Sequence, residues 1–292
     1  MSVDLTGKIA IVTGAGAGLG RAEAVALARA GARVVLNDLP GSAEEAAEEI
    51  RAFGGEAVIA PGDVSERATA DAMMAAAVDG FGGLDIVVNN AGITRDKMLF
   101  NMSDEEFDLV VRIHLRGHFL LTRNAAAHWR SVAKSTGAPV DAAVVNTSSE
   151  AFLSGPPGQA NYGAAKAGIT ALTMSTARAM GRSGVRANAI CPRAATAMTE
   201  GVLSGDSYGP EHVAPLVTYL TSPAAAAITG QVFVVYGGMI AVLAPPTVAE
   251  RFDNAAWDLD SLDKQVGGWF ADRDPAAGFS ADSIMQLKLK EQ

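Results

Sequence analysis

Short apolar runs alternate with longer stretches of helical spacing along the first 240 residues of this chain. The run Ile9–Thr13 is followed by glycines and then by apolar residues at helical spacing up to a stop at Gly31. The expected strands are 9–13, 34–38, 56–60, 84–88, 144–147, 185–191 and 231–236. The expected helices are 21–29, 41–53, 65–81, 103–134, 159–182 and 212–221. Their short connections predict an α/β, doubly wound Rossmann fold, with a seven-stranded, mostly parallel sheet and helices on both faces.

The pattern changes after residue 240. A Pro-Pro pair is followed by scattered acidic residues, Trp257 and Trp269, and no further strand–helix unit is visible. We therefore expect a dinucleotide-binding and catalytic Rossmann domain over 1–240 and a C-terminal extension over 241–292. We expect the extension to be an arm that docks by its aromatic residues on the body or on a neighbouring subunit.

Charge and cysteine content narrow the class of partner and the compartment. The net charge is −9, and no cluster of basic residues occurs, which argues against nucleic acid or an anionic membrane as the partner. No uninterrupted apolar run reaches about 18 residues, and the N-terminus lacks the pattern of a signal peptide. We expect a cytoplasmic protein. The single cysteine, Cys191, lies in an apolar run and is expected in the core rather than as a nucleophile.

A glycine-rich turn joins the first expected strand to the first expected helix. Gly14 permits a tight turn, Gly18 lets backbone N–H groups of the turn approach a pyrophosphate, and Gly20 lets the helix pack closely on the strand. Leu19 belongs to the same turn. The N-terminus of the helix supplies partial positive charge in place of a basic side chain. The pattern indicates a dinucleotide site.

An acidic residue, Asp38, ends the second expected strand. Its carboxylate can accept hydrogen bonds from both ribose hydroxyls of an adenosine, and its charge would repel a 2′-phosphate. No arginine stands at residues 37–40, where recognition of a 2′-phosphate would need one. The predicted cofactor is therefore NAD rather than NADP.

Two later strand ends add candidates for cofactor binding. Asp63 and Val64 follow the third strand, where Asp63 either meets the adenine edge or caps the next helix. Asn90, Ala91 and Gly92 follow the fourth strand, where small residues allow close contact with a cofactor or simply a tight turn.

The stretch 146–166 predicts a site of proton transfer. Ser149 follows a buried strand, and Tyr162 and Lys166 lie four residues apart on an expected helix, so both point from one face. A nearby ammonium favours a phenolate, so Lys166 can make Tyr162 a usable acid or base. A Tyr–Lys pair alone is often only a solvated helix face, and the cofactor site is what gives this pair significance.

The residues quoted so far resemble the short-chain dehydrogenase/reductase family over 1–240. The matching motifs are Thr13-Gly14-x-x-x-Gly18-x-Gly20, Asn89-Asn90-Ala91-Gly92, Ser149, and Tyr162-x-x-x-Lys166, with thirteen positions from Ser149 to Tyr162. The resemblance implies that Tyr162 is the general acid/base, that Ser149 binds the substrate oxygen, and that Lys166 binds the nicotinamide ribose and lowers the pKa of Tyr162.

Two positions depart from the family pattern. His114 stands where the family has a fourth catalytic residue, an Asn that holds a relay water, and Arg193 replaces the Gly of the usual Pro-Gly. A histidine in an apolar helix is usually a core residue, and His118 one turn later has no Glu or Cys set beside it, so we expect no metal site. The run His114-Leu-Arg-Gly is similar to the hydroxyacyl-CoA dehydrogenase part of peroxisomal multifunctional enzymes.

The expected function is NAD-dependent interconversion of an apolar secondary alcohol and its ketone, of the 3-hydroxyacyl-CoA or hydroxysteroid type. The expected apolar lining of the substrate site is Phe152, Leu153, Met198, Val202 and Leu203, and the candidates for binding CoA phosphates are Arg95, Lys97 and Arg193. Two alternatives remain open: an NAD-binding sensor or scaffold with little turnover, and an NADP-dependent 3-oxoacyl carrier-protein reductase. The resemblance also implies a homo-oligomer, a tetramer or dimer, that pairs helices 103–134 and 159–182.

Overall fold

An eight-stranded sheet forms the centre of the computed structural model, which describes residues 3–199, 201, 203–274, 278, 281, 284 and 286–289. The strand order is β3-β2-β1-β4-β5-β6-β7-β8. The strands are β1 (Ile9–Thr13), β2 (Arg33–Asn37), β3 (Ala57–Ile59), β4 (Ile86–Asn89), β5 (Ala142–Thr147), β6 (Val185–Pro192), β7 (Val232–Tyr236) and β8 (Met239–Val242). The doubly wound fold is confirmed, and the order reverses between β1 and β4, which is where such sheets bind ligands.

The sheet has one strand more than the seven expected. All neighbours pair in parallel except β7 and β8, which form an antiparallel hairpin closed by Gly237 and Gly238. Exposure alternates along β8, as in an edge strand with one covered face. The strand β8 has only four residues after a glycine pair, which is too short for a periodic pattern to be recognised in the sequence. The domain boundary expected at residue 240 therefore falls inside this strand.

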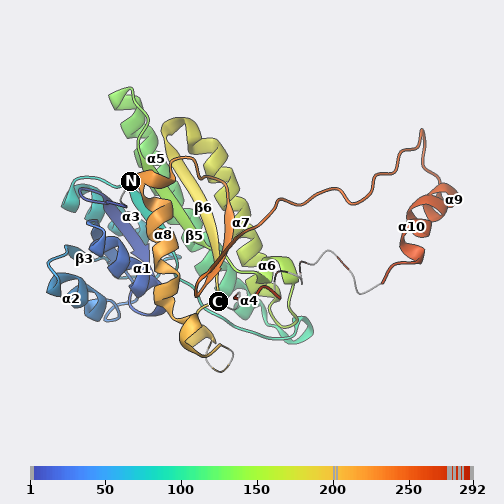
Figure 1. Ribbon diagram of the computed structural model, residues 1–292, viewed down its shortest axis with the longest axis horizontal. Helices are drawn as coiled ribbons and strands as arrows, with labels where there is room; N and C mark the ends of the chain where they lie inside the picture. Colours follow the sequence, from blue (N-terminus) through green and yellow to red (C-terminus); the bar gives the residue numbers. More distant parts are fainter. Residues whose placement is uncertain are drawn as a thin grey trace.

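Two helical layers cover the sheet (Figure 1). Residues of α1 (Gly18–Arg29), α2 (Glu44–Ala52) and α8 (Ala214–Thr221) pack in one apolar cluster. Residues of α3 (Arg67–Ala75), α5 (Gly117–Thr136) and α7 (Ala160–Met180) pack in the other. Alternate strand residues enter opposite clusters, as Ala10 and Val12 do against Ile9 and Ile11, because successive side chains of a strand point to opposite faces.

The helix expected at 103–134 is continuous but not uniform. It begins as α4 (Asp104–Val111), whose expected capping box of Ser103 and Glu106 is present, and it passes through a π-helical turn over Arg112–Arg116 before α5. Such turns insert an extra residue and are frequent at functional sites. Here the π-helical turn carries His114.

The C-terminal extension leaves the body after β8 and carries the short helices α9 (Leu259–Leu262) and α10 (Gly268–Ala271), which stand apart from the sheet (Figure 1). Trp269 packs edge-on against both Phe252 and Phe270. Trp269 therefore packs within the arm, and the helices that carry it lie away from the sheet, so the described structure does not show the expected docking of Trp269 on the body. Docking on a neighbouring subunit stays a prediction. In the described part of the chain, no helix has both the length and the apolar character needed to cross a bilayer.

Candidate active site

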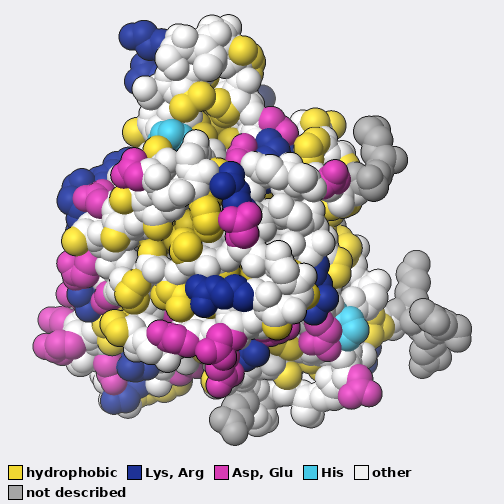
Figure 2. Space-filling view, turned by 90° about the vertical axis from the view of Figure 1, so that its left-hand side faces the viewer, with side chains coloured by type: hydrophobic (Ala, Val, Ile, Leu, Met, Phe, Trp, Pro, Cys, Tyr) yellow, Lys and Arg dark blue, Asp and Glu magenta, His cyan; other side chains and the backbone are white. Residues whose placement is uncertain are grey.

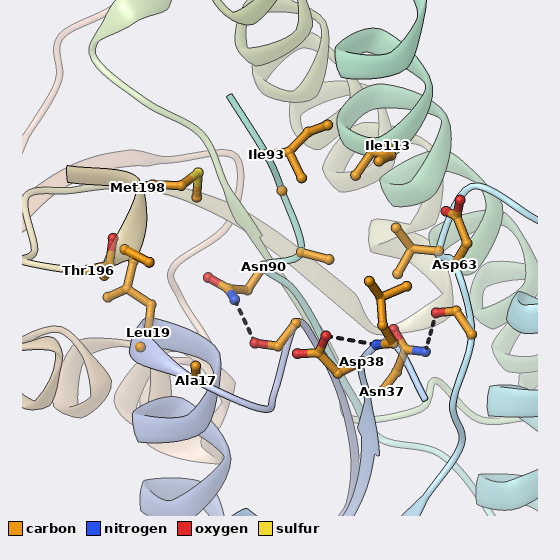
Figure 3. A pocket seen from close by; sticks show the side chains of 18 residues that line it. Ala17, Leu19, Asn37, Asp38, Asp63, Asn90, Ile93, Ile113, Thr196 and Met198 are labelled. Carbon is orange, nitrogen blue, oxygen red and sulfur yellow. Dashed lines mark hydrogen bonds between the residues drawn. The ribbon is translucent and has the colours of Figure 1, made fainter. Parts of the chain in front are cut away.

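A cavity of about 370 Å³ lies at the carboxyl ends of β1, β2 and β4 (Figure 3). It brings together residues that are far apart in the sequence, at the topological switch point of the sheet. The expected cofactor residues that line it are Gly14, Gly18, Leu19, Asp38, Asp63, Val64, Asn90, Ala91 and Gly92. Lining residues that the sequence analysis did not assign to the cofactor are Ala17, Asn37, Leu39, Gly62, Ile93, Ile113, Thr196, Ala197 and Met198.

The glycine turn fits the part of a dinucleotide cradle. Gly14 has a φ of +65° and Gly18 a φ of +53°, a backbone region that side chains disfavour. A Cβ on Gly14 would lie 2.9 Å from the Cα of Ala91. A Cβ on Gly20 would collide with the carbonyl of Gly14, so Gly20 does not line the cavity but allows the turn to close.

Asp38 is oriented by the glycine turn itself. One carboxylate oxygen accepts the N–H of Gly16 at 2.9 Å and the other accepts the N–H of Leu39 at 2.7 Å. A carboxylate has about four acceptor sites, so two remain for ribose hydroxyls. Asp63 also lines the cavity, and its Oδ1 accepts hydrogen bonds from the N–H and hydroxyl of Ser65. It therefore supports the turn before α3 as well.

Thr13 fixes the loop after β4 against the glycine turn. Its hydroxyl oxygen accepts the N–H groups of Asn90 at 3.0 Å and Ala91 at 3.1 Å. The Asn90 amide in turn donates to the carbonyls of Thr13 and Gly14, at 3.2 and 3.3 Å. The sequence motif includes Thr13 without indicating that its hydroxyl holds this loop. A hydroxyl directly before the first glycine is the signal that could have identified its role.

Ser149, Tyr162 and Lys166 meet beside this cavity, from the end of β5 and the first turns of α7. The Nζ of Lys166 is buried and donates to the carbonyl of Thr147 at 2.6 Å, and it lies 5.3 Å from the ring centroid of Tyr162. The Ser149 hydroxyl accepts the N–H of Ala151 at 3.2 Å, which leaves its own proton free to donate. The three side chains form one polar cluster.

Burial dominates the protonation of this cluster. It raises the pKa of Tyr162 to about 12, although the hydrogen bond with Ser149 acts in the opposite direction. Burial also lowers the pKa of Lys166 to about 7. The expected lowering of the Tyr162 pKa by Lys166 is therefore not the net outcome here. At neutral pH Tyr162 keeps its proton, and Lys166 is close to its point of titration.

His114 is fully buried and touches both halves of the site. Its Nε2 lies 2.7 Å from the carbonyl oxygen of Ile93 and 3.0 Å from the N–H of Ile93, and its ring packs edge-on to Tyr162 with centroids 5.3 Å apart. The shorter contact favours a proton on Nε2, which leaves Nδ1 as a buried acceptor with no partner among the described residues. Burial lowers the pKa of His114 well below its ordinary value, so the ring is neutral.

Gly92 and His114 are matched in shape. A Cβ on Gly92 would collide with the His114 ring. We expect Gly92→Ala to destabilise the protein by about 1–3 kcal/mol, as overpacking of a core does. Combining it with His114→Ala should remove the overlap between the added Cβ and the ring. The destabilisation of the double variant, measured by urea titration, should therefore differ by at least about 0.5 kcal/mol from the sum for the two single variants. Additive effects of the two changes would contradict the match.

The residues expected around the substrate do not form one lining. Phe152 lines a second cavity of about 490 Å³ together with Met98, Leu99 and Phe100, whereas Met198 belongs to the cofactor cavity. Val202 lies outside the described residues. The second cavity adds a run of exposed apolar residues, 98–100, that the sequence analysis did not assign to the substrate site.

Arg193 is not available to bind a phosphate. Its guanidinium forms two hydrogen bonds of 2.7 Å with the carboxylate of Glu150, and both side chains are largely buried. Lys97 pairs with Glu106 at 3.0 Å on the surface, and Arg95 is exposed. Of the three expected phosphate ligands, only Arg95 and Lys97 remain candidates. Cys191 is buried as expected, and burial raises its pKa to about 12.

Residues 8–206 match the family model described as short chain dehydrogenase. The chain belongs to the short-chain dehydrogenase family. It is therefore an oxidoreductase of a family that uses a nicotinamide cofactor, and the glycine turn, Asp38 and the cavity beside them fit such a group.

Individual relatives of this short-chain dehydrogenase agree with the family match. A hydroxyacyl-CoA dehydrogenase, ChsB1, of Mycobacterium tuberculosis is 57% identical over 98% of this chain and 95% of the relative. The peroxisomal multifunctional enzyme type 2 of Mus musculus is 40% identical over 73% of this chain and 30% of its own length. A crystal structure of a short chain dehydrogenase from Mycobacterium avium matches with a TM-score of 0.85 and 44% identity, over 93% of this chain and 97% of that one. The expected resemblance to hydroxyacyl-CoA dehydrogenases is confirmed.

Proposed function

We propose that this short-chain dehydrogenase interconverts a 3-hydroxyacyl thioester or a related apolar secondary alcohol and its ketone, with NAD as cofactor. The observation that carries the proposal is the cluster of the half-buried Ser149 and Tyr162 with the buried Lys166, beside the cavity that Asp38 lines. The 57% identity with a hydroxyacyl-CoA dehydrogenase supports the substrate class.

The residues of the cluster have separate parts in the proposed reaction. Tyr162 carries its proton at neutral pH, so it can donate that proton to a carbonyl oxygen and recover it from the alcohol in the reverse direction. Ser149 donates a hydrogen bond to the same oxygen. Lys166, with a pKa of about 7, is the neighbouring group that can exchange protons with the phenol. A bound nicotinamide supplies the acceptor or donor of the hydride.

His114 is assigned a positioning part. Its hydrogen bond to the Ile93 carbonyl holds the loop after β4, which lines the cofactor cavity, and its edge-on packing fixes the ring of Tyr162. A neutral, fully buried imidazole with a depressed pKa is a poor carrier of protons to solvent. We therefore do not propose that His114 takes over the proton relay that the Asn at this position supports in the family pattern.

The apolar second cavity suits an acyl chain or a steroid, because Met98, Leu99, Phe100 and Phe152 all contribute to it. Arg95 and Lys97 are the proposed contacts for CoA phosphates. The proposal is tested by reduced-nicotinamide absorbance with NAD and a panel of 3-hydroxyacyl-CoA, hydroxysteroid and sugar alcohols. Turnover of the first two classes alone is expected. Cofactor binding without turnover of any of the three classes would favour a sensor or scaffold.

The preference for NAD is tested by changing the charge beside the ribose. Asp38→Asn with Leu39→Arg removes the repulsion of a 2′-phosphate and adds a cation for it. We expect the ratio of NADP to NAD affinity, measured by fluorescence titration of the reduced cofactors, to rise by at least about tenfold. Asp63→Asn, in the same cavity, is the matched control and should leave the ratio unchanged. An unaltered preference in the double variant would refute the assignment of Asp38.

The remaining partner assignments are proposals of the same kind. On the face shown in Figure 2, Lys and Arg side chains are interspersed with acidic ones rather than gathered in one basic patch, which supports a small-molecule substrate over nucleic acid. Phe107 of α4, Phe119 of α5 and Met174 of α7 are exposed apolar residues on the helices expected to pair in a dimer or tetramer.

A further inference from the structure

Arg193 follows the last residue of β6, and only 13% of its side chain is exposed. Its Nε and Nη2 each donate to one carboxylate oxygen of Glu150, at 2.7 Å, in the parallel two-bond geometry that guanidinium and carboxylate groups favour. Glu150 comes directly after Ser149. The ion pair therefore joins the end of β6 to the residue next to the catalytic hydroxyl.

The other bonds of the guanidinium reach the C-terminal end of the chain. Nη1 donates to the carbonyl of Leu287 at 2.6 Å and Nη2 donates to the carbonyl of Ile284 at 2.7 Å. The hydroxyl of Tyr236, at the end of β7, donates to the same Leu287 carbonyl at 3.1 Å. The guanidinium carbon lies 4.9 Å from the centroid of the Tyr236 ring. We call this set of contacts the Arg193 clamp.

Described residues of the clamped segment also contact α6 and the turn after β7. The N–H of Ala281 bonds the carbonyl of Leu153, in the short helix α6 (Ala151–Ser154), and Leu289 lies against Gly237 after β7. Leu287 and Leu289 are half-buried while Gln286 and Lys288 are exposed, so one apolar side of this segment faces the body. None of its described residues lines the cofactor cavity.

The energetics make the clamp dependent on each charged partner. A buried guanidinium and a buried carboxylate each lose hydration, and their mutual attraction compensates only when the remaining donors are also bonded. The carbonyls of Ile284 and Leu287 satisfy those donors. Removing Arg193 would leave Glu150 as an unpaired buried charge and the two carbonyls without their donors.

We propose that the described residues of the C-terminal segment (Ala281, Ile284 and 286–289) form a wall of the substrate site, and that Arg193 is the positioning residue that holds this wall and Ser149 in register. The inference rests on the proposed function for the identity of the substrate. It extends that function by naming an element that encloses the bulky part of the substrate: an apolar wall that contacts α6 and the turn after β7. The wall selects long or wide apolar substrates, since a short one does not reach it.

The position of the segment is tested without turnover. In the full-length protein, hydrogen exchange of peptides from 281–289 should be at least about tenfold faster in Arg193→Met than in the wild type, because the Ile284 and Leu287 anchors are lost. Arg193→Lys keeps the positive charge but not the two parallel donors of the guanidinium. Its exchange rate should lie between those of the wild type and Arg193→Met. Arg251→Met removes an exposed arginine of the arm, paired with Asp253, and should leave the exchange unchanged. Wild-type exchange in a folded Arg193→Met protein would overturn the clamp.

The contribution to the substrate site is tested by a comparison of two thioesters. In Arg193→Met, KM for a long-chain or steroid 3-hydroxyacyl thioester should rise at least about tenfold more than KM for 3-hydroxybutyryl thioester. An equal rise for both would overturn the wall while leaving the proposed function intact. Tyr236→Phe removes only the hydroxyl that bonds Leu287 and leaves both partners of the Arg193–Glu150 ion pair in place. The Tyr236→Phe variant should show a smaller rise in KM for the long-chain or steroid thioester relative to the short one. If both this KM ratio and the hydrogen exchange of the C-terminal segment stay at wild-type values, the inference is contradicted.

Discussion

Replacing Tyr162 by Phe should lower kcat by about 10²- to 10⁴-fold, because it removes the one phenolic proton in the cluster with Ser149 and Lys166. The ring itself would keep its packing against His114 and Lys166, since both contacts are made with the ring rather than with the hydroxyl. The loss should therefore appear in kcat under saturating cofactor and substrate. Steady-state absorbance of the reduced nicotinamide measures it.

Tyr219→Phe is the matched control for this change. Tyr219 is partly exposed on α8, outside both cavities, and its substitution should leave kcat within about twofold of the wild type. Cofactor affinity of the Tyr162→Phe protein, measured by fluorescence titration, should also stay near that of the wild type. Turnover within about fivefold of the wild type in Tyr162→Phe would remove Tyr162 from the mechanism.

Glu23 should make the fold less stable as the pH rises. Its carboxyl is fully buried in α1 and both oxygens lack a partner among the described residues, so burial raises its pKa from 4.5 to about 8. The folded protein then binds a proton that the unfolded chain releases. The unfolding free energy should fall by about 1.4 kcal/mol for each pH unit between those two pKa values, and this contribution should be lost above about pH 8.

The contribution of Glu23 can be isolated by subtraction. Lys166 has a lowered pKa and makes the fold more stable as pH rises above about 7, so the wild-type profile alone mixes opposite slopes. Glu23→Met keeps the volume and removes the charge. Urea titrations between about pH 5 and about pH 9 should give a variant-minus-wild-type difference that grows with pH up to about 8. A difference that stays constant over this range would show that Glu23 does not titrate with a raised pKa.

Local patterns predicted most of the fold and most of the residues that meet in the candidate site. The strand, the glycine turn and the helix after Gly20 are specified by residues within one short stretch, so periodicity and backbone chemistry suffice. Ser149, Tyr162 and Lys166 were also accessible, because a strand end and one helical turn bring them together. The cavity residues Asp38 and Asn90 follow from the rule that parallel strands present their carboxyl ends at one edge.

Features that depend on contacts between distant segments were not predictable in this way. Arg193 meets Glu150 and the end of the chain only after β5, β6 and β7 are in register, so its sequence neighbours gave no sign of the ion pair. The balance that raises the pKa of Tyr162 depends on how deeply the folded chain buries it. The π-helical turn at His114 was not predictable either, because residues 103–134 have the apolar spacing of one continuous helix.

The Arg193 clamp also changes the topological character of the C-terminal extension. The chain leaves the body after β8, and the described residue Ala281 rejoins it beside α6, where its N–H bonds the carbonyl of Leu153, so the extension is held at two anchors. The entropy of closing such a loop grows only with the logarithm of its length. Insertions and deletions in this loop should therefore change the free energy of unfolding little, as long as both anchors persist. The length of the loop could then vary among relatives of this protein without a change in the register of β7, β8 or the clamp.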